Sequence, residues 1–117
     1  MARLSTHVLD TSRGTPAAGV LIEVHLVEGD SRRRVASATT TADGRTDQPL
    51  LAGEHLEAGI YELTFHAGAY LRAAGVPQAD PPFLGDVVVR IGIADASGNY
   101  HVPLLLSPFA YSTYRGT

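Results

Sequence analysis

The amino-acid sequence predicts an all-β protein, a two-sheet β-sandwich that carries one short helix. Apolar residues alternate with other residues along several short segments, which is the period of a strand with one buried face. Glycine, asparagine and aspartate punctuate the sequence between these segments, as expected for tight connections between strands. The 117 residues can enclose one two-layer core, so residues 1–117 are expected to form one domain with one site.

The strand predictions follow from this alternation, which is clearest in three segments. Residues 20–26 are apolar at every even position, whereas residues 60–66 and 86–94 carry their expected inward-facing side chains at odd positions. The remaining strands are shorter or less regular. The complete set of expected strands is 5–10, 20–26, 34–41, 60–66, 86–94, 101–107 and a final one over 110–116.

One segment departs from the strand pattern and predicts a helix over residues 69–74. It contains good helix formers, and Gly75 follows at a position where glycine commonly ends a helix. Residues 76–83 come next and are rich in proline, which prevents regular hydrogen bonding. We therefore expect a surface loop after the helix.

Composition excludes several kinds of chemistry. The chain has no cysteine, and all nine basic residues are arginine, so thiolate nucleophiles, disulfides, zinc-thiolate sites and lysine Schiff bases are ruled out. The net charge of −3 provides no basic surface for nucleic acid. No apolar run has the length of a signal peptide or a membrane span. We expect a cytoplasmic protein that binds neither nucleic acid nor membranes.

Five histidines are candidates for chemistry, but three of them have ordinary structural interpretations. His25 and His66 face away from the apolar stripe of their strands, and His55 lies in an acidic loop. Histidines at such positions are more often surface or structural residues than catalytic ones. No pair has the close spacing that places two imidazoles on one face, so no metal site is expected.

Four stretches carry a resemblance to a known family. Leu-Ser-Thr-His-Val-Leu-Asp-Thr-Ser-Arg-Gly stands at 4–14, Pro-Ala-Ala-Gly-Val at 16–20, and Asp-Gly-Arg at 43–45. The fourth stretch runs from His-Val-Pro at 101–103 to Tyr-Arg-Gly-Thr at 114–117. Together they resemble the 5-hydroxyisourate hydrolases, the enzymatic branch of the transthyretin-like family, over essentially the entire chain. The resemblance implies a transthyretin-like (prealbumin-like) sandwich.

The resemblance also implies a site built from distant parts of the chain. His7 and His101 coincide with histidines of the hydrolase signatures, and each lies in an expected strand among apolar neighbours. Arg45 matches the arginine of the second family motif and follows Asp43-Gly44 in a tight turn. We expect His7, Arg45 and His101 to be catalytic, with His7 and Arg45 also binding the substrate.

The last four residues would complete this site. Tyr114 and Arg115 are expected to bind the substrate, because they lie in a terminus that resembles the family ending. Thr117 is expected to be catalytic, its hydroxyl and terminal carboxylate orienting water or a histidine. The commoner family ending is serine; threonine keeps the hydroxyl and adds a methyl group.

The implied reaction is hydrolytic opening of the 5-hydroxyisourate ring at its N1–C6 amide bond. The product would be 2-oxo-4-hydroxy-4-carboxy-5-ureidoimidazoline, in urate catabolism. The two imidazoles would activate water and pass its proton to the leaving nitrogen, with either one as the base. Arg45 would hold substrate oxygens and stabilise developing charge. No metal or organic cofactor is expected.

The resemblance further implies a homotetramer, a dimer of dimers, with sites in channels at the dimer–dimer interface.

Two other functions remain open from the sequence. One is a non-enzymatic, transthyretin-like carrier that holds a small apolar or aromatic ligand in a central channel. The other is a structural sandwich used for adhesion or assembly. Neither has a need for His7, Arg45 and His101 together, and the hormone carriers have a different ending in place of the tetrapeptide.

Overall fold

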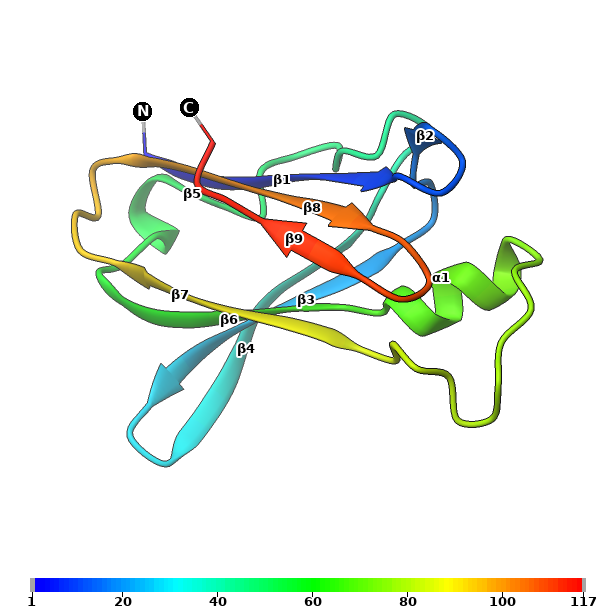
Figure 1. Cartoon of the computed structure of the whole chain (residues 1–117). Helices are drawn as coiled ribbons and strands as arrows, with labels where there is room; N and C mark the ends of the chain where they lie inside the picture. Colours follow the sequence, from blue (N-terminus) through cyan, green and yellow to red (C-terminus); the bar gives the residue numbers. More distant parts are fainter. Residues whose placement is uncertain (1, 117) are drawn as a thin grey trace.

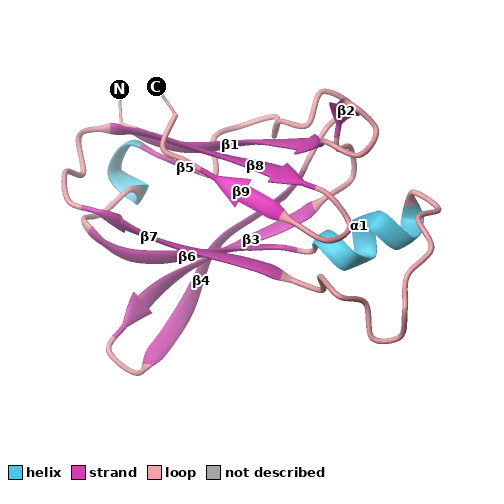
Figure 2. Ribbon diagram, in the orientation of Figure 1, coloured by secondary structure: helices cyan, strands magenta, loops and turns pink. Residues whose placement is uncertain are grey.

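The computed structural model describes residues 2–116 as two stacked β-sheets with an α-helix at one end (Figure 1). Sheet A has the strand order β2-β1-β8-β9, with β5 also paired to β1, and sheet B has the order β4-β3-β6-β7. The strands are β1 (Arg3–Asp10), β2 (Thr15–Pro16), β3 (Leu21–Glu28), β4 (Ser31–Thr39), β5 (Leu51–Ala52), β6 (Gly59–Phe65), β7 (Val87–Ile93), β8 (Asn99–Leu106) and β9 (Tyr111–Thr113). The helices are α1 (Ala67–Ala73) and a 3₁₀ turn, η1 (Gly53–His55) (Figure 2).

This architecture confirms the predicted all-β sandwich with one short helix. Each expected strand is present within a few residues of its predicted bounds, while β2, β5 and η1 were not predicted because two or three residues are too short to show a period. The last strand is shorter than expected: its continuous pairing with β8 ends at Thr113, and a single bridge between His101 and Gly116 follows in the same register. The next partner on β8 would be Pro103, which has no backbone N–H to donate.

The core lies between the two sheets and is filled from alternating positions. Even residues of β1 and β3 and odd residues of β6 point inward, which confirms the predicted inward faces of residues 20–26 and 60–66. The largest completely enclosed side chains come from four strands and α1. They are Tyr61, Phe65, Leu4, Ile22, Leu63, Leu71, Leu104 and Leu106.

Strands β1 and β8 pair in parallel along their full length, although nearly the whole chain separates them (Figure 1). The register places Ser5 opposite His101 and His7 opposite Pro103. Every other pair of strands in the described structure is antiparallel. The parallel pairing brings the two ends of the sequence together at the centre of sheet A.

Helix α1 ends as the sequence predicts, at a glycine in the left-handed region. Gly75 has a φ of 82°, and its N–H bonds to the carbonyl of Arg72 while the N–H of Val76 bonds to the carbonyl of Leu71. This pair of bonds satisfies carbonyls at the helix end, and Cβ crowding disfavours the conformation for other residues. Among residues 2–116, α1 is the longest helix with seven residues, and no helix has the length and apolar character of a membrane span.

Asp10 joins the end of β1 to α1 through a buried carboxylate. Its side chain is fully enclosed and accepts hydrogen bonds from the Tyr70 hydroxyl at 2.7 Å and from the backbone and hydroxyl of Ser12. Arg13 adds a guanidinium at 3.2 Å. Burial raises the pKa of Asp10, but the hydrogen bonds outweigh burial and hold the pKa below its ordinary value of 3.8.

We predict that Asp10→Asn lowers the free energy of unfolding by about 1–3 kcal/mol, because one buried donor loses its acceptor. The folded-state pKa of Asp10 lies below the unfolded value, so its contribution is present above about pH 4 and is lost as pH falls further. Urea unfolding at pH 7 and at pH 3 should therefore show a smaller acid destabilisation in the variant.

Asp95→Asn is the matched control. Asp95 makes the same two bonds, to the backbone and hydroxyl of Ser97, but it lies at the surface. Its replacement should change stability much less than the replacement of Asp10. Equal effects of the two substitutions would contradict a special contribution from the buried carboxylate.

Candidate active site

The candidate site lies on the outer face of sheet A, where β1 and β8 run side by side. The even residues of β1 are buried in the core, whereas Ser5 and His7 are half-buried on the other face. His101 is half-buried on β8, directly opposite Ser5. The parallel register therefore places both predicted histidines on one face, one strand apart.

The imidazole of His101 is held from both sides. On the β1 side, its Nδ1 lies 2.9 Å from the hydroxyl of Ser5. On the other side, the backbone N–H of Gly116 donates to the His101 carbonyl at 2.7 Å, and a Cβ added at Gly116 would lie only 2.7 Å from the ring atom Cδ2. Glycine at 116 thus permits the tail to lie against the ring.

The surroundings of His101 favour its neutral form. Burial lowers the pKa of His101 below its ordinary value of 6.5, and the positive charges of Arg45, His7 and Arg3 lower it further. A neutral imidazole has one nitrogen without a proton, and such a nitrogen can take a proton from water. The environment therefore suits His101 to act as a base near neutral pH.

His7 is oriented by the turn that precedes Arg45. Its Nε2 lies 2.9 Å from the backbone carbonyl of Asp43. A carbonyl oxygen can only accept, so Nε2 carries the proton and donates it. When His7 is neutral, its unprotonated nitrogen is therefore Nδ1.

The turn at 41–45 depends on a glycine for its close approach to β1. Gly44 has a φ of 80°, and a Cβ there would lie 2.3 Å from the Val8 carbonyl oxygen and 3.2 Å from the His7 ring. Its own carbonyl accepts the N–H of Val8 at 2.8 Å. The Asp43 side chain accepts bonds from the hydroxyl of Thr41 and the backbone of Arg45, which keeps its pKa low. These contacts give Arg45 a rigid base.

Arg45 reaches into a depression of about 410 Å³ beside His101. Arg3 and Arg45 make its lining largely cationic, His101 adds a neutral polar ring, and Asp47 contributes a carboxylate. The His7 ring is turned toward Asp43 and is not part of the lining. The depression is lined by Arg3, Ser5, Thr6, Arg45, Thr46, Asp47, Gln48, Pro49, Asn99, Tyr100 and His101.

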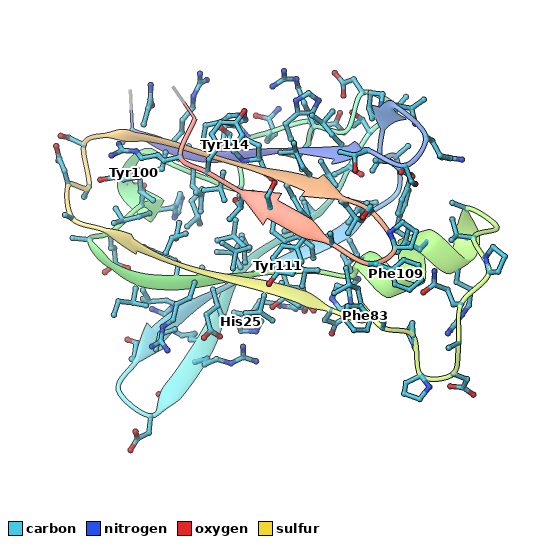
Figure 3. All side chains as sticks on the ribbon, viewed as in Figure 1. His25, Phe83, Tyr100, Phe109, Tyr111 and Tyr114 are labelled. Atoms are coloured by element: carbon cyan, nitrogen blue, oxygen red, sulfur yellow. The ribbon has the colours of Figure 1, made fainter. Side chains whose placement is uncertain are left out.

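The predicted tail residues take different positions. The Arg115 guanidinium donates to the Asn99 carbonyl at 3.1 Å and lies 4.3 Å from the centre of the Tyr100 ring, and Arg115 is not among the residues that line the depression. Tyr100 lies between the two sheets, and Tyr114 is 60% exposed beside sheet A (Figure 3). Thr117, the other predicted tail residue, lies outside the described residues.

Three residues of this arrangement were missed in the sequence: Ser5, Gly44 and Gly116. Ser5 lies two positions before His7, so a shared strand face was readable, but its contact with His101 depends on a pairing between distant segments. The roles of Gly44 and Gly116 arise from close approach of other chain segments, which has no local signal. His25, His55 and His66 lie elsewhere, and His66 bonds to Glu23 and Asp86.

The arrangement can perform hydrolysis that uses water as the nucleophile. It offers an imidazole that is neutral near pH 7, a second imidazole with a fixed N–H, and a guanidinium for oxygen atoms that gain negative charge. A cavity of this size accommodates a small molecule. Among residues 2–116, no group of three histidine, aspartate or glutamate side chains is arranged to hold a metal ion.

Comparison with known proteins adds independent information. Residues 4–116 match the model of the HIUase/Transthyretin family. The chain is 56% identical over 115 residues to 5-hydroxyisourate hydrolase 2 of Rhizobium meliloti, covering 98% of this chain and 96% of that protein. It is also 53% identical to the 5-hydroxyisourate hydrolase of Pseudomonas aeruginosa, covering 100% of this chain and 93% of that protein.

Solved structures show the same fold. (S)-allantoin synthase matches with a TM-score of 0.92 and 39% identity over 99% of this chain, which spans only 44% of that longer chain. The 5-hydroxyisourate hydrolase of Klebsiella pneumoniae matches with a TM-score of 0.82 and 36% identity over the full length of both chains. Transthyretin from Sparus aurata matches with a TM-score of 0.88 and 30% identity over 99% of this chain and 97% of its own. The transthyretin-like sandwich predicted from the sequence is therefore confirmed.

We predict that Gly44→Ala displaces the turn, because its Cβ cannot share space with the Val8 carbonyl. The free energy of unfolding should fall by about 1–3 kcal/mol, and the ring proton resonances of His7 should shift as its bond to Asp43 weakens. Thermal unfolding and two-dimensional NMR of the imidazoles measure both effects.

Gly29→Ala separates crowding from backbone strain. Gly29 also has a positive φ, of 61°, but a Cβ there meets nothing within 4 Å. Its replacement should cost about 1 kcal/mol and leave the His7 resonances unchanged. A smaller cost at Gly44 than at Gly29 would show that the turn is not constrained by β1.

Proposed function

The chain belongs to the HIUase/Transthyretin family, and from this premise we propose that it hydrolyses 5-hydroxyisourate in urate catabolism. The product is 2-oxo-4-hydroxy-4-carboxy-5-ureidoimidazoline, formed by opening the ring at the N1–C6 amide bond. Residues 1–117 act as one domain with one set of site residues. The proposed reaction needs no metal or organic cofactor.

The observation that carries this proposal is the arrangement of His7, Arg45 and His101. The guanidinium of Arg45 and the imidazole of His101 line one depression on sheet A, and His7 lies on the same face, two residues along β1 from Ser5. The cationic, hydrogen-bonding lining of the depression suits a planar ring that is rich in oxygen and nitrogen. A carrier for an apolar ligand would need an apolar lining in its place.

The proposed hydrolysis takes place in two stages, attack of water on C6 and cleavage of the N1–C6 bond. An imidazole takes a proton from water as the water oxygen forms its bond to C6. The carbonyl oxygen becomes an oxyanion, and the guanidinium of Arg45 stabilises this charge. The N1–C6 bond then breaks, and the proton moves from the imidazolium to N1. The product is a ring-opened carboxylate.

The tail residues keep roles that rest on the family resemblance. We propose that Tyr114 positions the substrate ring, and that Thr117 orients water or a histidine through its hydroxyl or carboxylate. The guanidinium of Arg115 is engaged with Asn99 and Tyr100, which ties the tail beside His101. Direct contact of Arg115 with the substrate stays a prediction.

We also propose a homotetramer, a dimer of dimers, with the sites at the dimer–dimer interface. The depression is open on the outer face of sheet A, where a second copy would cover it. Strands β7 and β9 are edges of the described sheets, and an apolar cleft of about 330 Å³ lies between them. Phe83 and Phe109 are 72% and 76% exposed, and the centres of their rings lie 6.0 Å apart with the ring planes tilted by 48° (Figure 3). A cytoplasmic location is proposed from the sequence and is tested by cell fractionation.

The hydrolase function is tested by making 5-hydroxyisourate from urate in the cuvette and following its ultraviolet decay. Wild-type protein should accelerate the decay well beyond the spontaneous rate. His7→Asn or His101→Asn should lower kcat/KM by about 10²–10⁴-fold, because each removes a proton-transfer group. Arg45→Gln should lower it by about 10²–10³-fold, and removal of residues 114–117 should also reduce activity.

Matched variants control for general damage to the fold. His55→Asn replaces a histidine in the exposed 3₁₀ turn η1, and Arg33→Gln replaces an exposed arginine paired with Glu28. Both should retain wild-type activity. A wild-type protein that does not exceed the spontaneous rate would reject the hydrolase and favour the carrier, whereas loss confined to the truncated form would require new roles for the histidines.

The tetramer makes a separate prediction. Dilution below the assembly constant should abolish activity, because each site would lose its covering subunit, while the monomers remain folded by circular dichroism. Sedimentation and activity measured on the same dilution series provide the comparison. Full activity in isolated monomers would refute a site that requires the interface.

A further inference from the structure

We propose that Ser5 is the positioning residue of His101, and that its hydroxyl accepts the Nδ1–H so that unprotonated Nε2 faces the depression. This assignment rests on the proposed hydrolase function. It makes His101 the general base and leaves His7 as the partner with a fixed N–H. Ser5 acts through the imidazole and does not itself react.

The contact that supports this proposal is direct. The Ser5 hydroxyl lies 2.9 Å from Nδ1 of His101, and the two residues are paired in the parallel ladder of β1 and β8. Gly116 lies against Cδ2 on the opposite edge of the ring. Among residues 2–116, Ser5 is the only side chain that forms a hydrogen bond with a ring nitrogen of His101.

The chemistry of a base selects one tautomer. An imidazole that takes a proton on Nε2 must begin with Nε2 unprotonated, and a neutral ring then carries its proton on Nδ1. A hydroxyl accepts that Nδ1–H, and it still accepts it after Nε2 has been protonated. The same bond therefore serves the base and the imidazolium that follows.

The surroundings of the ring favour its neutral form. Burial is the larger cause of the lowered pKa of His101. The nearby positive charges of Arg45 on the turn and of His7 and Arg3 on β1 lower this pKa further. These positive charges disfavour the protonated ring, so His101 is available to accept a proton. Asp47 also lines the depression, while the guanidinium of Arg115 is turned to Tyr100.

His7 lacks this freedom, which distinguishes the two imidazoles. Its Nε2 donates to the Asp43 carbonyl, which can only accept. The ring keeps that proton in every state that preserves the bond. The unprotonated nitrogen of neutral His7 is Nδ1, and the His7 ring does not line the depression. The imidazole that faces water in the depression is therefore that of His101.

The test compares four variants with wild type in the decay assay and by ¹⁵N NMR of histidine-labelled protein. Ser5→Ala and Ser5→Val remove the hydroxyl, Ser5→Thr keeps it, and Thr11→Val is the control. The Thr11 hydroxyl bonds to the Leu106 carbonyl at 3.0 Å, so its loss removes a bond between the end of β1 and β8 without touching an imidazole. Thermal unfolding confirms that each variant is folded.

In wild type, the Nδ1 resonance of His101 should lie in the range of a protonated nitrogen at a pH where the ring is neutral. Ser5→Ala and Ser5→Val should shift it toward the other tautomer and lower kcat/KM by about tenfold or more. Ser5→Thr should restore the wild-type resonance and keep kcat/KM within about threefold. Thr11→Val should change neither quantity.

Different outcomes would reject the hydrolase function and the role of Ser5. Wild-type protein that does not accelerate the decay rejects the hydrolase function and, with it, the base assignment. Active wild type with an unprotonated Nδ1 on His101 overturns only the role of Ser5. The same conclusion follows if Ser5→Ala and Ser5→Val keep wild-type kcat/KM, or if Ser5→Thr loses as much as Ser5→Ala.

Discussion

The site depends on the parallel pairing of β1 with β8. Eight consecutive pairs join residues 3–10 to residues 99–106, so the backbone ladder holds the two ends of the chain in one register. Side chains alternate across a strand, and a shift of one residue would turn Ser5 and His7 into the core. The inner residues Leu4, Val8 and Leu104 are fully buried, so the core itself fixes the register of the outer face.

The other edge of β1 is occupied by the segment that carries Arg45. Strands β2 and β5 pair with the two ends of β1, and the turn at 41–45 bonds to its middle through the N–H of Val8. The close approach at Gly44 brings the Asp43 carbonyl to His7. The contacts on both sides of β1 therefore stabilise the fold and also set the geometry of the site.

The sandwich alone does not decide between an enzyme and a carrier, because the hydrolases and a transthyretin share its fold. The difference lies in the polar groups on the outer face of sheet A. His101 bonds to a hydroxyl, which can donate or accept, whereas His7 bonds to a carbonyl, which can only accept and therefore fixes the proton on Nε2. The depression beside them is lined by Arg3 and Arg45, which favours a ligand rich in acceptors.

Sequence reasoning could predict the local features of this protein. The alternation over 20–26 and 60–66 indicates the buried face because burial of every second side chain is a property of the strand itself, and Gly75 marks the helix end for the same local reason. Resemblance supplied His7, Arg45 and His101 as candidates, while their roles in substrate turnover stay predictions.

The tertiary structure decided which groups meet. Ser5 and His101 touch because a parallel ladder joins segments from opposite ends of the chain. Arg115 and Tyr114 are neighbours in the sequence, but the Arg115 guanidinium packs on the ring of Tyr100. The protonated nitrogen of His7 is set by the Asp43 backbone carbonyl, a group present in every residue and therefore without a sequence signal. The sequence by itself determined which faces are buried, since that preference is local, and only the pairing of distant strands determined the neighbours of each imidazole.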